Sequence, residues 1–345
     1  MTFIIHHSAF ITLESLSVMN KFLIAVVVLA SCASPRPSQS PKGEGAKHAS
    51  SSAISSKVID AGQLLEDVRV LSSDAMEGRG MGTKGGLMAR AFVVRRFSDL
   101  KLKTFGDSYE KPFETAPPAD ASSKTVGAAN VVGYVEGSQH PERFIVVSAH
   151  YDHLGIRGGQ IYNGADDNAS GVAAMLQIAA HFAHTRPRNS IIFAAFDGEE
   201  VGLLGARAFV KWIKDERRDV ALDVNLDMVS HSDGGELYAS GTYETPALAP
   251  SLKLLAARAP VHLLLGHDRP EQGQDDWTNQ SDQYAFYKVG IPFVYFGVED
   301  HKDYHKPTDD FDTITPVFFV HAAETILEAV EMLDGGTSGL ETPKS

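Results

Sequence analysis

Cysteine is almost absent from this 345-residue sequence, which contains a single one, Cys32. One cysteine cannot form a disulfide within the chain, and it cannot build a zinc site of several thiolates. A metal ion bound by this chain must therefore be held by histidine, aspartate and glutamate side chains.

Basic residues are also fewer than acidic residues. The chain has 31 lysines and arginines against 44 aspartates and glutamates, which gives a formal net charge of −13. A surface of this sign repels the phosphate backbone of nucleic acids. We therefore expect no nucleic-acid partner.

The amino-terminal region has no hydrophobic run long enough to span a bilayer as a mature helix. Its apolar stretch, Phe22–Ala30, follows Lys21 and ends in small residues, a pattern typical of a secretory signal. The sequence Leu29-Ala-Ser-Cys32 resembles a bacterial lipobox, in which the cysteine is lipidated. We expect an exported cell-envelope lipoprotein, held by a lipid on Cys32 at the outer membrane or the periplasmic face of a membrane. An ordinary cleaved signal with an incidental cysteine is the alternative.

These features divide the chain into segments. Met19 resembles a natural start, which makes residues 1–18 a mis-start extension. We expect a signal peptide and lipobox over 19–32, a flexible tether rich in serine and proline over 33–57, one folded domain over 58–335 and a disordered tail over 336–345.

Short apolar runs alternate with helical patterns in the domain. Asp60 is positioned to cap a first helix, and a second helix is expected over 86–100. Strands are predicted over 144–149, 190–196, 223–226, 235–240, 261–265 and 292–296. Further helices are predicted over 171–183, 204–213, 248–257, 283–289 and 316–333. Strands that are apolar throughout indicate an α/β fold whose mixed, mostly parallel central sheet is covered by helices on both faces.

Polar side chains follow three of these strands where each one ends. His150 and Asp152 follow the first, Glu199 and Glu200 follow the second, and Asp227 follows the third. In open α/β sheets, ligands bind in the crevice at the carboxyl ends of the strands. We therefore expect these side chains to meet at one edge.

Each of these residues also has an ordinary interpretation when it is taken alone. A single histidine after a strand can be a loop residue, and an adjacent glutamate pair can be a solvated helix start. The segment 164–171, which contains Asp167, can be a helix-capping loop, and His305 can lie in a surface loop. Together, however, the order His, Asp, Glu-Glu, Asp, His provides five metal ligands and one spare carboxylate, as a dinuclear zinc site requires.

A series of motifs carries a wider resemblance, in the chain order 71–80, 130–133, 150–153, 164–171, 196–203, 225–228, 281–282, 290–292 and 304–305. With these motifs the chain resembles the co-catalytic di-zinc aminopeptidases of metallopeptidase family twenty-eight, the leucyl aminopeptidase and aminopeptidase Y type. The resemblance spans about residues 58–335 and implies a single-domain zinc-peptidase fold.

The resemblance also assigns ligands to two zinc ions. It implies that His150 and Asp227 bind one zinc, that Glu200 and His305 bind the other, and that Asp167 bridges both. Spacing alone does not choose Asp167 over its neighbour.

Further roles follow from the same resemblance. It implies a cis peptide between Asp167 and Asn168, and it makes Asp152 the residue that orients the ring of His150. Arg79 lies in the first motif, and we expect it to form a structural ion pair.

The implied activity is removal of residues from peptides with a free N-terminus. Glu199 is the expected general base, which takes a proton from the attacking water and passes it to the leaving amine. Tyr304 is expected either to donate a hydrogen bond to the oxyanion or to pack beside the site.

Three alternatives stay open. Glutaminyl cyclases share the scaffold and use one zinc, although the segment 200–205 resembles the peptidase version. Carboxypeptidases of the family usually carry additional domains. A non-catalytic binding module on a peptidase scaffold would normally have lost ligands that are all present here.

Overall fold

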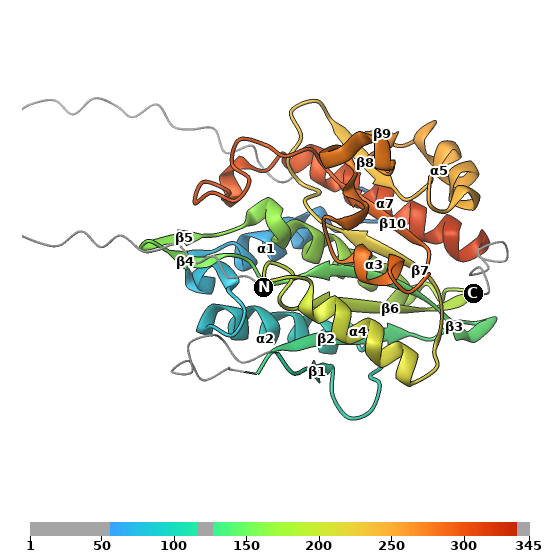
Figure 1. Ribbon diagram of the computed structural model, residues 1–345, viewed down its shortest axis with the longest axis horizontal. Helices are drawn as coiled ribbons and strands as arrows, with labels where there is room; N and C mark the ends of the chain where they lie inside the picture. The colour runs from blue at the N-terminus through green and yellow to red at the C-terminus, as the bar shows by residue number, and fades with distance from the viewer. Residues whose placement is uncertain (1–55, 116–126, 337–345) are drawn as a thin grey trace, which may run out of the picture. The chain divides into compact units, whose positions relative to one another are not determined.

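An eight-stranded sheet forms the centre of the computed structural model, which describes residues 56–115 and 127–336 (Figure 1). The order of its strands is β1-β2-β6-β3-β7-β10-β8-β9. They comprise β1 (Glu110–Pro112), β2 (Ala129–Val135), β3 (His140–His150), β6 (Asn189–Phe196), β7 (Asp219–Leu226), β8 (Glu236–Ser240), β9 (His262–Leu265) and β10 (Phe293–Gly297). A separate hairpin is formed by β4 (Gly155–Arg157) and β5 (Gln160–Tyr162).

The middle of the sheet is parallel. Strands β6, β3, β7 and β10 are parallel neighbours, and β8 is parallel to β9. The antiparallel pairs are β1 with β2, β2 with β6, and β8 with β10. The prediction of a mixed, mostly parallel sheet is confirmed.

Helices cover both faces of this sheet. They comprise α1 (Ala61–Leu71), α2 (Lys84–Asp99), α3 (Gly171–His184), α4 (Leu204–Asp215), α5 (Ala249–Ala256), α6 (Gln283–Tyr287) and α7 (Pro316–Gly336). Short helical turns lie at 74–79, 165–170, 246–248, 270–275, 277–279 and 311–313.

Alternating residues of β3 divide the core into two layers, because successive strand side chains point to opposite faces. Ile145 and Val147 belong to the cluster that contains the apolar faces of α1, α2, α3, α5 and α7. Val146 belongs to the second cluster, with Phe209 of α4 and Phe286 of α6. The predicted coverage of both faces is therefore confirmed.

Local signals in the sequence set several element ends. The backbone N–H of Gln63 donates to Asp60 Oδ1 at 3.0 Å, so Asp60 caps α1 as predicted. Such a cap typically stabilises a helix by about 1 kcal/mol. Strand β2 was not predicted as a strand. Gly133 in its centre packs against Phe97 and Leu102, where even a Cβ would be tightly placed.

Several expectations concern residues outside those that the structure describes. The extension over 1–18, the signal and lipobox over 19–32, nearly all of the tether over 33–57 and all but the first residue of the tail over 336–345 remain predictions. Within the described residues, no helix combines the length and the apolar character needed to cross a membrane.

Candidate active site

The carboxyl ends of the parallel strands meet at one edge of the sheet. His150 is the last residue of β3, Asp227 follows β7 directly, and Glu199 and Glu200 lie in the turn after β6. They border a cavity of about 250 Å³. The cavity is lined by His150, Asp167, Glu199, Glu200, Asp227, Met228, Trp277, Gln280, Tyr295, Val298, Asp300, Tyr304 and His305.

Asp167 lies between two groups of potential ligands. Its Oδ1 is 3.5 Å from His150 Nε2, which is also 3.3 Å from Asp227 Oδ1. Its Oδ2 is 3.0 Å from His305 Nε2, which is also 3.5 Å from Glu200 Oε2. The structure thus brings together all five predicted ligands, with Asp167 in contact with both histidines.

His153 is a site residue to which the sequence reasoning assigned no role. Its Nδ1 lies 2.7 Å from Glu200 Oε1 and 3.6 Å from Asp167 Oδ2. Within the described residues its buried Nε2 has no hydrogen-bond partner. The signal that could have revealed it is its place in the motif His150-Tyr-Asp-His153.

The segment that carries Asp167 is held in place by Asp309. The two carboxylate oxygens of Asp309 accept the backbone N–H groups of Asp166 and Asp167, each at 3.0 Å. The peptide between Asp167 and Asn168 is cis, as expected. Asn168 in turn donates from Nδ2 to the carbonyl of Leu226 at the end of β7, so the Asp167 segment is tied directly to the strand that precedes Asp227.

Arg79 is fully buried, and its role differs from the predicted ion pair. None of the ion pairs found among the described residues includes it. Its guanidinium instead donates to the backbone carbonyl oxygens of Leu71, Tyr151, Asn163, Gly164 and Asp167. These carbonyls come from the end of α1, from the residue after β3 and from the segment 163–167. An arginine can satisfy them all because it offers five N–H donors in one plane. The ion-pair prediction is therefore wrong, and Arg79 joins these segments to the one that carries Asp167.

Asp152 contacts the site through both its backbone and its side chain. His150 Nδ1 lies 3.1 Å from the backbone oxygen of Asp152 and 3.8 Å from its Oδ1. The carboxylate accepts the backbone N–H of Glu199 at 3.1 Å. The nearer partner of the imidazole is thus the Asp152 carbonyl, while the carboxylate fixes the turn that presents Glu199.

The two remaining candidates, Glu199 and Tyr304, also face the cavity. Burial raises the pKa of Glu199 well above its usual value, and the carboxylates of Asp282 and Asp227 act in the same direction. The ring of Tyr304 stacks on that of His305, with centroids 4.0 Å apart. Burial and then the charge of Asp167 raise the pKa of Tyr304, which keeps its hydroxyl protonated as a donor.

The donor set fits metal ions. Asp167, Glu200 and Asp227 point buried carboxylates at one cavity, and within the described residues their ion pairs are all with histidines. The buried guanidinium of Arg79 lies nearby, but it bonds to backbone carbonyl oxygens and is one positive charge against several carboxylates. Divalent cations neutralise the negative charge that remains. Imidazole nitrogens with carboxylate oxygens are ligands typical of zinc.

Similarity to known proteins points to metallopeptidases. The family profile described as "Peptidase family M28" matches residues 130–330. A "Probable zinc metalloprotease" of Pyrenophora tritici-repentis is 39% identical over 110 residues, which are 31% of this chain and 25% of that protein. The matches to the first five curated relatives span 24–34% of the lengths of those proteins.

Solved structures of proteins with two different activities share the fold. A zinc aminopeptidase from Bacillus subtilis superposes with a TM-score of 0.62 at 18% identity, over 79% of this chain and 94% of that one. A glutaminyl cyclase from Fimbriiglobus ruber superposes with a TM-score of 0.61 at 18% identity, over 81% and 98%. At these identities the similarity establishes the fold alone.

Proposed function

The chain belongs to peptidase family M28, and on that premise we propose that it is an aminopeptidase that removes N-terminal residues from peptides with two zinc ions. In this proposal His150 and Asp227 would hold one zinc, Glu200 and His305 would hold the other, and Asp167 would be shared by both. The observation that carries the proposal is the position of Asp167, whose two carboxylate oxygens face different histidines at 3.5 and 3.0 Å.

Zinc bound at these positions polarises the scissile carbonyl and makes water a stronger acid. Glu199 lies at the same cavity and is not needed as a ligand, so its carboxylate is free to accept the proton of the attacking water and deliver it to the leaving amine. Its backbone N–H donates to the Asp152 carboxylate, which fixes the turn that carries Glu199.

Tyr304 provides a hydrogen-bond donor for the reaction. In the metal-free protein, burial and then the charge of Asp167 raise the pKa of Tyr304, so its hydroxyl is protonated. A neutral phenol at the cavity can donate a hydrogen bond to the oxyanion that forms when water attacks the carbonyl. Losing a donor of this kind typically costs about 3–4 kcal/mol in transition-state stabilisation.

The size and lining of the cavity support an exopeptidase. At about 250 Å³ it is smaller than the usual range of about 300–1,000 Å³ for ligand sites, and it suits one residue better than a chain that continues in both directions. The lining is mostly polar, but Met228, Trp277, Tyr295 and Val298 contribute apolar or aromatic side chains to it. We infer a preference for an apolar side chain at the substrate's N-terminus.

Glutaminyl cyclisation is the competing activity, because a cyclase shares the fold. A cyclase that uses one zinc does not require a carboxylate that is shared between two groups of ligands. Asp167 lies between two such groups. We therefore favour hydrolysis.

A substrate panel separates the two activities. Protein lacking residues 1–32 is assayed on aminoacyl chromogenic substrates and on a peptide with N-terminal glutamine, with and without chelator. Chelator-sensitive release of apolar N-terminal residues supports the proposal. Formation of pyroglutamate without release of residues would replace it with cyclisation.

We also propose that the enzyme is attached to a bacterial membrane by a lipid on Cys32 and acts on peptides in the cell envelope. The support is the signal-like run before Leu29-Ala-Ser-Cys32. Fractionation of cells that express the full chain and its Cys32→Ser variant tests this attachment. The unchanged chain should be in the membrane fraction and the variant should not; equal distribution would refute the anchor.

A further inference from the structure

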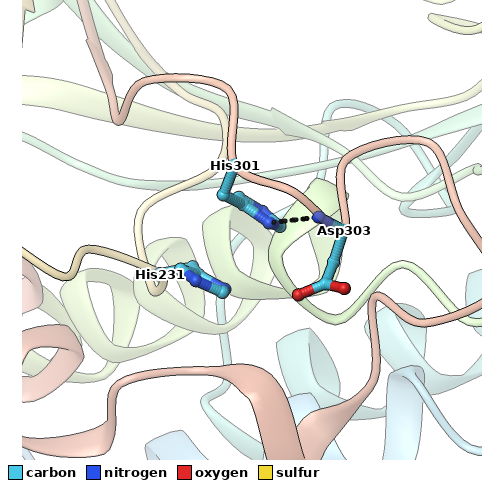
Figure 2. A group of neighbouring side chains, drawn as sticks. All are labelled: His231, His301 and Asp303. Carbon is cyan, nitrogen blue, oxygen red and sulfur yellow. Dashed lines mark hydrogen bonds between the residues drawn. The ribbon is translucent and has the colours of Figure 1, made fainter.

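A second group of potential metal ligands lies outside the candidate active site. It consists of His231, in the loop after β7, and His301 and Asp303, in the loop after β10 (Figure 2). One potential ligand atom from each residue lies within 4.8 Å of the other two. The two imidazole rings are stacked, at 8°, with centroids 3.9 Å apart. Their in-plane lone pairs therefore run side by side, and the His231 ring has to turn for both rings to bind one ion.

His301 is oriented by a buried carboxylate. Its Nε2 lies 3.2 Å from Asp166 Oδ2, and Asp166 is fully buried. The other oxygen of Asp166 accepts both the backbone N–H and the hydroxyl of Ser230, each at 2.7 Å. Histidines that bind metals typically donate their second ring N–H to such a carboxylate. This arrangement favours the proton on Nε2 and leaves the lone pair on Nδ1.

The lone pair on His301 Nδ1 accepts only one long hydrogen bond. The backbone N–H of Asp303 donates to His301 Nδ1 at 3.3 Å, the contact drawn as a dashed line in Figure 2. A distance of 3.3 Å is longer than the usual range for such a bond. His301 Nδ1 can therefore accept a stronger partner.

The other two residues each keep one buried atom unpaired. His231 and Asp303 are both only 7% exposed. In the part of the chain that the structure describes, His231 Nδ1 and Asp303 Oδ2 have no hydrogen-bond partner. The second oxygen of Asp303 is satisfied, because it accepts the hydroxyl of Thr308 at 2.8 Å. Buried polar atoms without partners are costly, so their coincidence in one cluster needs an explanation.

We propose that His231, His301 and Asp303 bind a further divalent cation, of the zinc class. Two imidazole nitrogens and one carboxylate oxygen are a borderline donor set that suits zinc and disfavours calcium, which takes more oxygen ligands. A cavity of about 260 Å³ lies beside both histidines and leaves room for water as a fourth ligand. The cavity is lined by four carboxylates and one lysine, so its potential favours a cation: Asp233, Glu236, Glu299, Asp300 and Lys302.

This cation would connect two loops that flank the candidate active site. His231 belongs to the chain that leaves Asp227, and His301 and Asp303 precede Tyr304 and His305 in sequence. A cation shared by the two loops holds the segment that carries Tyr304 and His305 against the end of β7. Its role is therefore structural and distinct from the proposed hydrolysis.

Metal content measured by plasma mass spectrometry tests the site. Wild-type protein and the His231→Gln variant are each dialysed against zinc buffered at a low free concentration. His184→Gln, which removes an exposed imidazole at the end of α3, is the matched control. We expect His231→Gln to bind one zinc fewer per chain than the wild type and His184→Gln to bind the same number.

The difference between proteins decides the outcome, so the test does not depend on how many ions the active site holds. Equal zinc content in the wild type and His231→Gln would overturn the proposal. Asp303→Asn is a second variant that preserves side-chain volume and serves if His231→Gln does not fold, with circular dichroism as the check. It should lose the same single equivalent, and retention of that equivalent in a folded Asp303→Asn protein would also overturn the proposal.

Hydrogen exchange gives an independent readout. In zinc-containing buffer, backbone amides of residues 299–309 should exchange faster in His231→Gln than in the wild type, because the cross-link between the loops is gone. Unchanged exchange there, together with unchanged zinc content, would leave the cluster as a hydrogen-bonded network without metal.

Discussion

Both carboxylate oxygens of Asp309 accept backbone N–H groups of the segment that carries Asp167, and the one that pairs with Asp167 itself does so at 3.0 Å. Asp309 is fully buried and lies four residues after His305 in sequence. One side chain therefore joins the loop of the proposed bridging ligand to the loop of a second ligand. The position of Asp167 depends on this contact.

Replacing Asp309 by asparagine should weaken metal binding. An amide keeps one acceptor oxygen but presents an NH₂ group to the second backbone N–H, so one of the two bonds is lost. Loss of a group that orients a ligand typically costs about 10–100-fold in metal affinity. Competition with a chromogenic zinc chelator measures this, with exposed Asp312→Asn as the control. Equal affinities in both variants would contradict the role of Asp309.

Gly164 should not tolerate alanine. Its φ is +57°, and an added Cβ would overlap the carbonyl oxygen of Asp167 and the ring of His153. Gly158 has nearly the same φ, +58°, but nothing lies within 4 Å of its Cβ position, so Gly158→Ala isolates the cost of the backbone conformation.

The expected costs differ between the two glycine variants. Gly158→Ala should destabilise the protein by roughly 1–2 kcal/mol from its left-handed backbone alone. Gly164→Ala adds the overlap and should cost roughly 2–5 kcal/mol. Urea unfolding measures both, and equal losses would show that the close approach at Gly164 has no energetic consequence.

Glu199→Gln should remove the general base without removing a ligand. We expect kcat to fall by about 10²–10⁴-fold, the usual contribution of such proton transfer, while zinc content stays unchanged. Glu142→Gln is the matched control, because Glu142 is exposed at the opposite end of β3. A Glu199→Gln protein with normal turnover would exclude Glu199 as the base, and one that loses zinc would make it a ligand.

Removal of metal should make stability depend on pH. In chelated protein, burial opposes the charge on His305, but Asp167 and Glu200 raise its pKa from 6.5 to about 10. A pKa raised on folding stabilises the folded state below about pH 6.5, and that contribution is lost as the pH rises toward 10. The effect is reduced by solvent because the His305 side chain is 40% exposed.

Thermal unfolding of chelated and zinc-loaded protein measures this dependence. The Tm of the chelated protein should fall between about pH 6.5 and 10, and more steeply than that of the zinc-loaded protein, in which His305 is already bound. A parallel decline in both forms would show that His305 does not carry the effect.

The sequence permitted prediction of those parts of the site that follow directly from strand ends. His150 ends one apolar run, Asp227 directly follows another, and Glu200 lies in the turn after a third; parallel strands bring such ends to one edge. The fold class follows from the same runs, because strands buried on both faces need helices on both faces.

Other parts of the site depend on contacts between distant residues, which one sequence does not reveal. Arg79 lies 88 residues from Asp167, and Asp309 lies 142 residues from it. An isolated arginine suggests an ion pair, and only the folded chain shows that several loops turn their carbonyl oxygens toward it. His153 is hard to predict for a different reason, since its neighbour His150 already accounts for the motif His150-Tyr-Asp-His153.

The most direct test of the account is a crystal structure of zinc-loaded protein with anomalous diffraction recorded at the zinc edge. We predict two peaks in the candidate active site, one in contact with His150 and Asp227 and one with Glu200 and His305, and both in contact with Asp167. A single peak there, or two peaks that do not share Asp167, would contradict the proposed two-metal centre.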